Sequence, residues 1–314
     1  MSTLTRAELR QVEDANASGR RVVVFVHGLW LLASSWDRWR AEFERAGYAT
    51  VAPGWPDDPP DVATARADPS VFAGKKVGRV TEHHLEAIGR LRERPAVVGH
   101  SFGGLIAQRL AGLGASRATV AIDPAPFRGV LPLPLSSLRS AAPVLGNPAN
   151  ARRAVTLTFE QFRYGWAGAL SEQEARALYE EFHVAAPGAP LFQAATANVN
   201  PFTEAAVDVR NPERGPLLLV SGERDTTVPW ALTRAAHARQ RRNPGVTEVV
   251  ELPGRGHSLT IDSGWREVAG TALGFLTEHF PALPAPGGPG GPGERADDGR
   301  DGRDGLAQPA PSGA

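Results

Sequence analysis

The chain has no cysteine among its 314 residues. Disulfide bonds, thiolate catalysis and cysteine-ligated zinc are therefore excluded. Charge of one sign is not in excess either, because 34 Lys and Arg residues balance 34 Asp and Glu residues. This balance gives no reason to expect a nucleic acid or an acidic membrane as a partner, and it favours a small, mostly neutral substrate.

Long apolar runs are also missing. No stretch reaches the length of a membrane-spanning helix, and residues 1–21 contain no apolar segment long enough for a signal peptide. We therefore expect no membrane span and a cytoplasmic location.

Short apolar runs alternate with longer amphipathic segments, which predicts an α/β fold. Most of the apolar runs lack polar alternation, as strands buried on both faces do. The predicted strands are 21–26, 48–51, 96–98, 118–122, 217–220 and 246–252, and the main predicted helices are 34–46, 77–91, 102–113, 230–242 and 264–280. We expect a mostly parallel sheet of about six strands, covered by helices on both faces.

Three segments fall outside this alternation. Residues 1–20 are predicted to form an N-terminal helical segment that precedes the core of 21–123 and 215–283. Residues 124–214 interrupt the rhythm with a proline-rich entry and helical stretches, so we interpret them as an inserted lid. Residues 284–314 are rich in Gly, Pro, Asp and Arg, a composition that predicts a disordered tail.

One Gly-x-Ser-x-Gly pattern occurs, at Gly99-His100-Ser101-Phe102-Gly103. A predicted strand precedes it and a predicted helix follows it, which is the context of a nucleophile elbow. Gly99 and Gly103 leave room for a tight turn in which larger side chains would collide. The pattern predicts Ser101 as a nucleophile.

A serine nucleophile needs a base and an orienting carboxylate. His257 and Asp225 follow the last and the fifth predicted strands, so their loops leave the same sheet edge as Ser101. Asp123, which ends the fourth strand, is an alternative acid that could replace Asp225, and Glu223 is a weaker one. We predict Asp225 and His257 as the partners of Ser101.

Two backbone N–H groups should form an oxyanion hole. We predict the amide of Phe102, directly after the nucleophile, and the amide of Leu29 in the loop His27-Gly28-Leu29-Trp30 after the first strand. Apolar side chains near this point should line the substrate pocket. Besides Phe102, the candidates are Trp30, Leu131, Phe159, Phe162, Trp166 and Phe192.

Four motifs in this order resemble the α/β-hydrolase superfamily, in particular its lidded serine esterase, lipase-like and cofactor-free haloperoxidase branch. They are His27–Trp30, Gly99–Gly104, Gly222–Pro229 and Gly256–Ser258. The resemblance covers about residues 20–280. The sequence departs from the family at two points. Only about twenty residues precede the first predicted strand, so we expect the first two strands of the family to be absent. The nucleophile is a serine, which argues against the haloalkane dehalogenases and epoxide hydrolases, which use a carboxylate.

From these residues we expect a serine hydrolase that cleaves a small apolar carboxylic ester, or a related acyl bond, through an acyl-enzyme and without metal or organic cofactor. Two alternatives stay open. The same residues would serve an acyltransferase, a perhydrolase or a biosynthetic tailoring enzyme, or they could persist in a non-catalytic ligand receptor. The oligomeric state is not predicted by the sequence.

Overall fold

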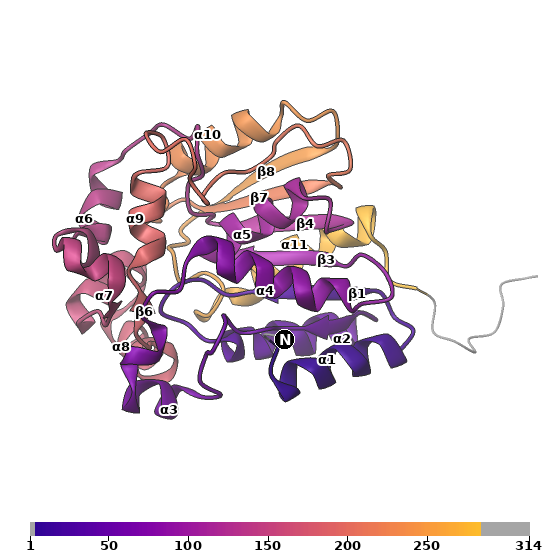
Figure 1. Ribbon diagram of the computed structural model, residues 1–314, viewed down its shortest axis with the longest axis horizontal. Helices are drawn as coiled ribbons and strands as arrows, with labels where there is room; N and C mark the ends of the chain where they lie inside the picture. Colours follow the sequence, from indigo (N-terminus) through magenta and orange to yellow (C-terminus); the bar gives the residue numbers. More distant parts are fainter. Residues whose placement is uncertain (1–3, 284–314) are drawn as a thin grey trace, which may run out of the picture. The chain divides into compact units, whose positions relative to one another are not determined.

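The structure is a computed structural model that describes residues 4–283. The predicted tail at 284–314 lies outside the described residues. Six parallel strands form one sheet in the order β2-β1-β3-β4-β7-β8, which confirms the predicted architecture (Figure 1). Their bounds are β1 Val22–Val26, β2 Ala49–Val51, β3 Ala96–His100, β4 Ala118–Ile122, β7 Leu217–Gly222 and β8 Thr247–Leu252.

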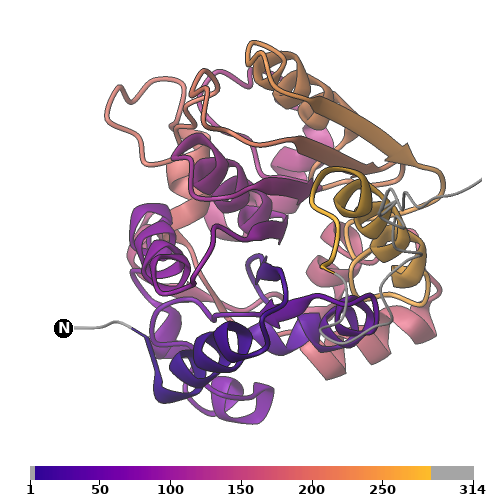
Figure 2. The ribbon, with the colours of Figure 1, turned by 90° about the vertical axis from the view of Figure 1, so that its right-hand side faces the viewer.

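Alternate residues of each central strand pack into two separate cores, one on each face of the sheet. On one face, Val24 of β1 packs with helices α1 (Arg6–Ala17), α4 (Val77–Gly89), α5 (Phe102–Gly112) and α10 (Trp230–Gln240). On the other face, Phe25 packs with α2 (Asp37–Arg45) and α11 (Trp265–His279). Figure 2 shows these helices on the two sides of the sheet. The uninterrupted apolar runs in the sequence follow from this double coverage.

Helix α1 begins where a capping box is formed. The Thr5 hydroxyl accepts the amide of Glu8, and the Glu8 carboxylate accepts the amide of Thr5 at 2.7 Å. These two hydrogen bonds satisfy two backbone N–H donors at the N-terminus of the helix. The same carboxylate also contacts His83 Nε2 at 3.0 Å, so the neighbouring histidines His83 and His84 serve α4 packing, with His84 Nδ1 donating to the Val80 carbonyl.

Between β4 and β7 the chain forms mainly helices and adds no strand to the main sheet. This segment, residues 123–216, is called the β4–β7 insertion below. Its helices α6–α9 gather at one end of the sheet (Figure 1). Their bounds are α6 Leu135–Leu145, α7 Phe159–Gly165, α8 Glu172–Phe182 and α9 Ala189–Ala195, and a short ladder joins β5 (Ala154–Val155) to β6 (Ala186–Pro187). The remaining helix is α3, Val62–Ala67, and the short 3₁₀ turns are Ala33–Trp36, Pro69–Phe72 and Pro148–Arg152.

Candidate active site

Ser101 occupies a strained turn between β3 and α5. Its backbone has φ 56° and ψ −120°, in a region that non-glycine residues avoid. The Ser101 amide donates to the Ile122 carbonyl at 2.9 Å, which ties the turn to β4. A Cβ at Gly99 would overlap the carbonyl of Gly103, and a Cβ at Gly103 would overlap the carbonyl of Val26. The two glycines are therefore required by close backbone approach.

His257 links Ser101 to Asp225 by two hydrogen bonds. Its Nε2 lies 3.0 Å from the Ser101 Oγ, and its Nδ1 lies 2.6 Å from the Asp225 Oδ2. A ring with the proton on Nδ1 donates to the carboxylate and accepts from the hydroxyl. All three side chains are buried. This is the geometry in which a histidine can remove the proton of a serine hydroxyl.

The Asp225 carboxylate is held by its own turn. Its Oδ1 accepts the backbone amides of Thr227 at 2.7 Å and Val228 at 2.8 Å. These bonds leave Oδ2 directed at His257. Of the three acids considered from the sequence, Asp225 is the one that is hydrogen-bonded to the histidine.

Asp123 lies next to this pair. Its Oδ2 is 4.0 Å from His257 Nδ1, and its Oδ1 accepts the Gly222 amide at 2.8 Å. Burial raises the pKa of Asp123 well above its usual range, and the negative charge of Asp225 raises it further. Both effects favour the protonated, neutral form of Asp123. Glu223 is turned away and accepts the amide of Gly254 at 2.7 Å.

The loop after β1 lies directly over Ser101. A Cβ on Gly28 would come within 2.9 Å of the Ser101 Cβ, so only glycine lets the loop approach this closely. Within residues 4–283, neither the Leu29 amide nor the Phe102 amide donates to a protein acceptor. Both are therefore available to a ligand, and Phe102 is also the first residue of α5, where the helix dipole favours negative charge.

A buried charge cluster that we did not predict supports this loop. His27 places Nδ1 2.8 Å from the Gly28 carbonyl and Nε2 3.1 Å from the Asp58 carboxylate, and Lys75 Nζ lies 2.6 Å from the other Asp58 oxygen. Burial raises the pKa of Asp58, but His27 and Lys75 outweigh it and hold the pKa below its usual range. One signal was available: Lys75 and Lys76 are the only lysines in a chain otherwise basic through arginine.

The rings of Trp166 and His100 pack against the ring of His257, and neither residue lines the cavity at Ser101. The Trp166 ring meets the His257 ring edge-on, with centroids 4.8 Å apart, and the His100 ring lies 4.8 Å from His257 on another side. Burial lowers the pKa of His100 well below its usual range, and His257 lowers it further. These rings keep water from the His257 ring.

Three hydrogen bonds fasten the end of α7 to the loops that carry the acid and the base. The hydroxyls of Thr226 and Thr227 donate to the carbonyls of Tyr164 at 2.7 Å and Gly165 at 2.6 Å. The Ser258 amide donates to the Trp166 carbonyl at 3.0 Å. The β4–β7 insertion therefore contacts both loops directly.

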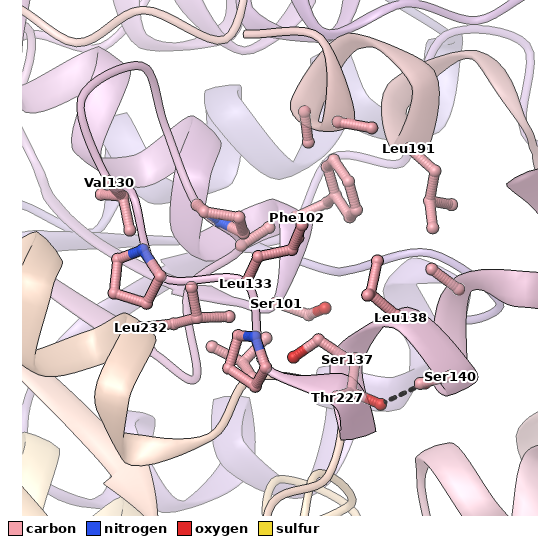
Figure 3. A pocket seen from close by; sticks show the side chains of 18 of the residues that line it. Ser101, Phe102, Val130, Leu133, Ser137, Leu138, Ser140, Leu191, Thr227 and Leu232 are labelled. Carbon is pink, nitrogen blue, oxygen red and sulfur yellow. Dashed lines mark hydrogen bonds between the residues drawn. The ribbon is translucent and has the colours of Figure 1, made fainter. Parts of the chain in front are cut away.

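An apolar cavity of about 300 Å³ opens at Ser101 (Figure 3). Of the aromatic and leucine side chains predicted to line it, Trp30, Phe102 and Leu131 do so. Phe159, Phe162, Trp166 and Phe192 lie outside its wall: Phe162 stacks on Trp166, Phe159 packs on Tyr179, and Phe192 packs against the core. Leucines from the insertion and from α10 take their place, namely Leu133, Leu138, Leu191 and Leu232.

Potential metal ligands meet at one point in the described part of the chain. His100, Asp123 and His257 each offer one ligand atom, all within 4.8 Å of one another. His257, however, already has both ring nitrogens engaged by Ser101 and Asp225. A metal there would displace the hydrogen bonds just described, so the donor set fits proton transfer better than metal binding.

Comparison with known proteins identifies a family. A model described as the alpha/beta hydrolase family matches residues 23–271. The comparison with curated proteins found no match.

Among solved structures, the chain is similar to a monoacylglycerol lipase from Paleococcus ferrophilus, with 20% identity, a TM-score of 0.57 and coverage of 83% of this chain and 98% of that one. It is also similar to an extracellular alpha/beta-hydrolase from a Paenibacillus species, with 19% identity, a TM-score of 0.59 and coverage of 81% and 98%. A putative non-heme bromoperoxidase from Mycobacterium tuberculosis matches with 18% identity, a TM-score of 0.58 and coverage of 82% and 92%. At these identities the likeness concerns the fold.

Proposed function

The chain belongs to the alpha/beta hydrolase family, and from this premise we propose that it hydrolyses carboxylic esters with Ser101 as the nucleophile. The observation that carries the proposal is the hydrogen-bonded series Ser101–His257–Asp225, which opens onto an apolar cavity. A carboxylate nucleophile, as in dehalogenases, has no counterpart here because a serine occupies the elbow.

The reaction proceeds in two steps. In the first, His257 takes the Ser101 proton at Nε2 while Oγ attacks the ester carbonyl, and Asp225 stabilises the imidazolium that forms. The amides of Leu29 and Phe102 donate to the carbonyl oxygen as it becomes an oxyanion. His257 then gives its proton to the leaving alcohol, which departs and leaves Ser101 acylated.

In the second step, His257 removes a proton from a water molecule, whose oxygen attacks the acyl carbonyl. The tetrahedral intermediate rests on the same two amides and collapses to release the carboxylic acid. The proton returns from His257 to Ser101 Oγ. No step requires a metal ion or an organic cofactor.

The cavity indicates the kind of ester. It is lined mainly by leucine, alanine and proline side chains, and its volume of about 300 Å³ is at the small end for ligand pockets. Few polar groups interrupt the wall; the hydroxyls of Ser140 and Thr227 are bonded to each other at 2.6 Å (Figure 3). We therefore expect an apolar acyl group of short to medium length to be preferred.

A fluorophosphonate probe tests the nucleophile. Intact-mass analysis should show one adduct on the wild-type chain and none on Ser101→Ala. A panel of aryl esters from acetyl to palmitoyl, measured beside the same variant, should show turnover that falls by about 10⁴-fold or more when Ser101 is replaced. Tight binding of these esters by the wild type without turnover would instead favour a ligand receptor, and product trapping by added alcohols would favour an acyltransferase.

A further inference from the structure

Exposed apolar side chains are concentrated around the mouth of the Ser101 cavity. Residues 4–283 contain nine large hydrophobic side chains that are exposed, and six of them lie on two neighbouring segments of the β4–β7 insertion, one of which runs into the start of α6. These six include the five most exposed of the nine, from 69% for Leu133 to 91% for Phe202. We call them the apolar rim: Leu131, Leu133, Leu135, Leu138, Val199 and Phe202.

The two segments of the rim form one surface because the loop residues next to them are hydrogen-bonded to each other. The Asn198 side chain accepts the Gly129 amide at 2.7 Å and donates to the Val130 carbonyl at 2.9 Å. Arg128 Nη1 donates to the Pro201 carbonyl at 3.0 Å. Clustered apolar exposure of this kind marks an interaction surface, in contrast to single exposed leucines.

The rim is continuous with the cavity. Leu131, Leu133 and Leu138 belong to the rim and also line the cavity that reaches Ser101. Figure 3 shows Leu133 and Leu138 at this wall. An apolar chain can therefore pass from the rim to the nucleophile over side chains that are apolar throughout. A surface that served only to hold another protein would not need this connection.

The two chain segments that carry the rim contain charge of one sign. Residues 124–159 contain four arginines and no acidic residue, and residues 183–203 contain no Asp, Glu, Lys or Arg. Arg128 and Arg139 are exposed beside the rim and form no ion pair within the described residues. Glu204, the next acid along the chain, is turned toward α4, where it accepts the Gly78 amide at 2.8 Å. The zero net charge of the whole chain hides this local excess of positive charge.

From these observations we propose that the apolar rim docks on the surface of an anionic lipid aggregate and takes a lipid-borne ester from it into the Ser101 cavity. Leucine and phenylalanine side chains insert among the acyl chains, and the arginines beside them contact the anionic headgroups. A second copy of the chain fits the same surface less well, because rim-to-rim contact would bring identical arginines together. The ester transfer rests on the proposed function, whereas the docking does not.

Vesicle binding by the full chain tests the docking. The probes are vesicles of phosphatidylcholine alone and vesicles of phosphatidylcholine and phosphatidylglycerol in equal amounts. The test variant replaces three rim residues that do not line the cavity, Leu135→Ser, Val199→Ser and Phe202→Ser together. Leu113→Ser is the matched control, because Leu113 is 56% exposed but follows the far end of α5.

We expect the wild type and Leu113→Ser to bind the anionic vesicles, with binding weakened by added salt. The triple variant should bind at least about 100-fold more weakly, since each side chain of this size contributes roughly ten-fold when it leaves water. Unchanged melting temperatures show that the variants are folded. Ser101→Ala should bind as the wild type does, so a failure of the ester hydrolysis proposal leaves this result intact.

Three results would overturn the docking proposal. The first is a wild type that binds neither kind of vesicle. The second is a folded triple variant that binds as tightly as the wild type. The third is a concentration-dependent dimer in sedimentation equilibrium that the triple variant loses, without vesicle binding, which would assign the rim to a second copy of the chain.

Discussion

Asp123 holds a carboxyl oxygen 4.0 Å from Nδ1 of His257, although Asp225 forms the 2.6 Å hydrogen bond to that nitrogen. Two carboxyl groups thus converge on one side of the histidine, and burial and the neighbouring charge raise the pKa of Asp123. This close placement favours a single negative charge on the pair, because burying two negative charges would cost far more than burying one.

Replacing each acid by its amide should separate their roles. Asp225→Asn removes the charge that orients His257 and should lower kcat by about 10⁴-fold. Asp123→Asn replaces a carboxyl group whose neutral form is favoured with an amide of similar shape, and it should lower kcat by less than about ten-fold. Steady-state kinetics on a soluble aryl ester measures both, and equal losses in the two variants would contradict this division.

The raised pKa of Asp123 should also appear in the dependence of stability on pH. From about pH 4 upward the unfolded chain releases this proton while the folded protein keeps it, so the contribution of Asp123 to stability falls as the pH rises. Asp123→Asn has no such loss. Urea unfolding at about pH 5 and about pH 7 should show that the variant gains stability relative to the wild type at the higher pH, and a constant difference would refute it.

His183 should make the protein sensitive to acid. Burial, together with the charge of Arg66, lowers the pKa of His183 to about 4. As the pH falls below the usual histidine value of 6.5, the unfolded chain gains a proton that the folded protein does not, so stability falls. His183→Phe retains a ring to stack on Tyr179 and should reduce this slope by up to about 1.4 kcal/mol per pH unit.

The same urea series checks the histidine prediction. Above pH 7 the wild type and His183→Phe should have parallel stability curves, because His183 is neutral in both the folded and the unfolded chain there. Curves that stay parallel down to about pH 5 would show that the folded protein accepts the proton without cost.

Two adjacent lysines offer a controlled test of the cluster beneath the β1 loop. Lys75 is buried against Asp58, whereas Lys76 is exposed. Lys75→Met removes one partner of a buried ion pair and should lower the free energy of unfolding by about 3–5 kcal/mol. Lys76→Met should change it by less than about 0.5 kcal/mol. Chemical denaturation measures both, and similar small effects would mean that His27 alone satisfies Asp58.

The sequence is sufficient to predict candidate site residues that directly follow the ends of strands. Ser101, Asp225 and His257 follow three strands that were recognisable as apolar runs, and parallel strands bring such positions to one edge. Within the loops the prediction was less complete, because Asp123 and Asp225 both end strands at that edge. Only the side-chain geometry distinguishes Asp225, which is hydrogen-bonded to His257, from Asp123.

The cavity wall could not be predicted in the same way. Aromatic residues in the insertion were the natural candidates, yet Phe162 and Trp166 stack on each other and bury themselves against the core. Periodicity shows which face of a helix is apolar, but it does not show whether that face meets the core or a ligand. The Asp58–Lys75 pair joins residues on separate loops, and no spacing rule connects them.

The three hydrogen bonds from the end of α7 to the acid and base loops bear on how this enzyme class could be re-engineered. An insertion that contributed only the side chains that line the cavity could be exchanged between related proteins as a module. Here the carbonyls of Tyr164, Gly165 and Trp166 also anchor Thr226, Thr227 and Ser258, which flank Asp225 and His257. A chimera that imports a foreign insertion would therefore have to import these acceptors as well, or else lose the alignment of the proton-transfer pair together with the old specificity.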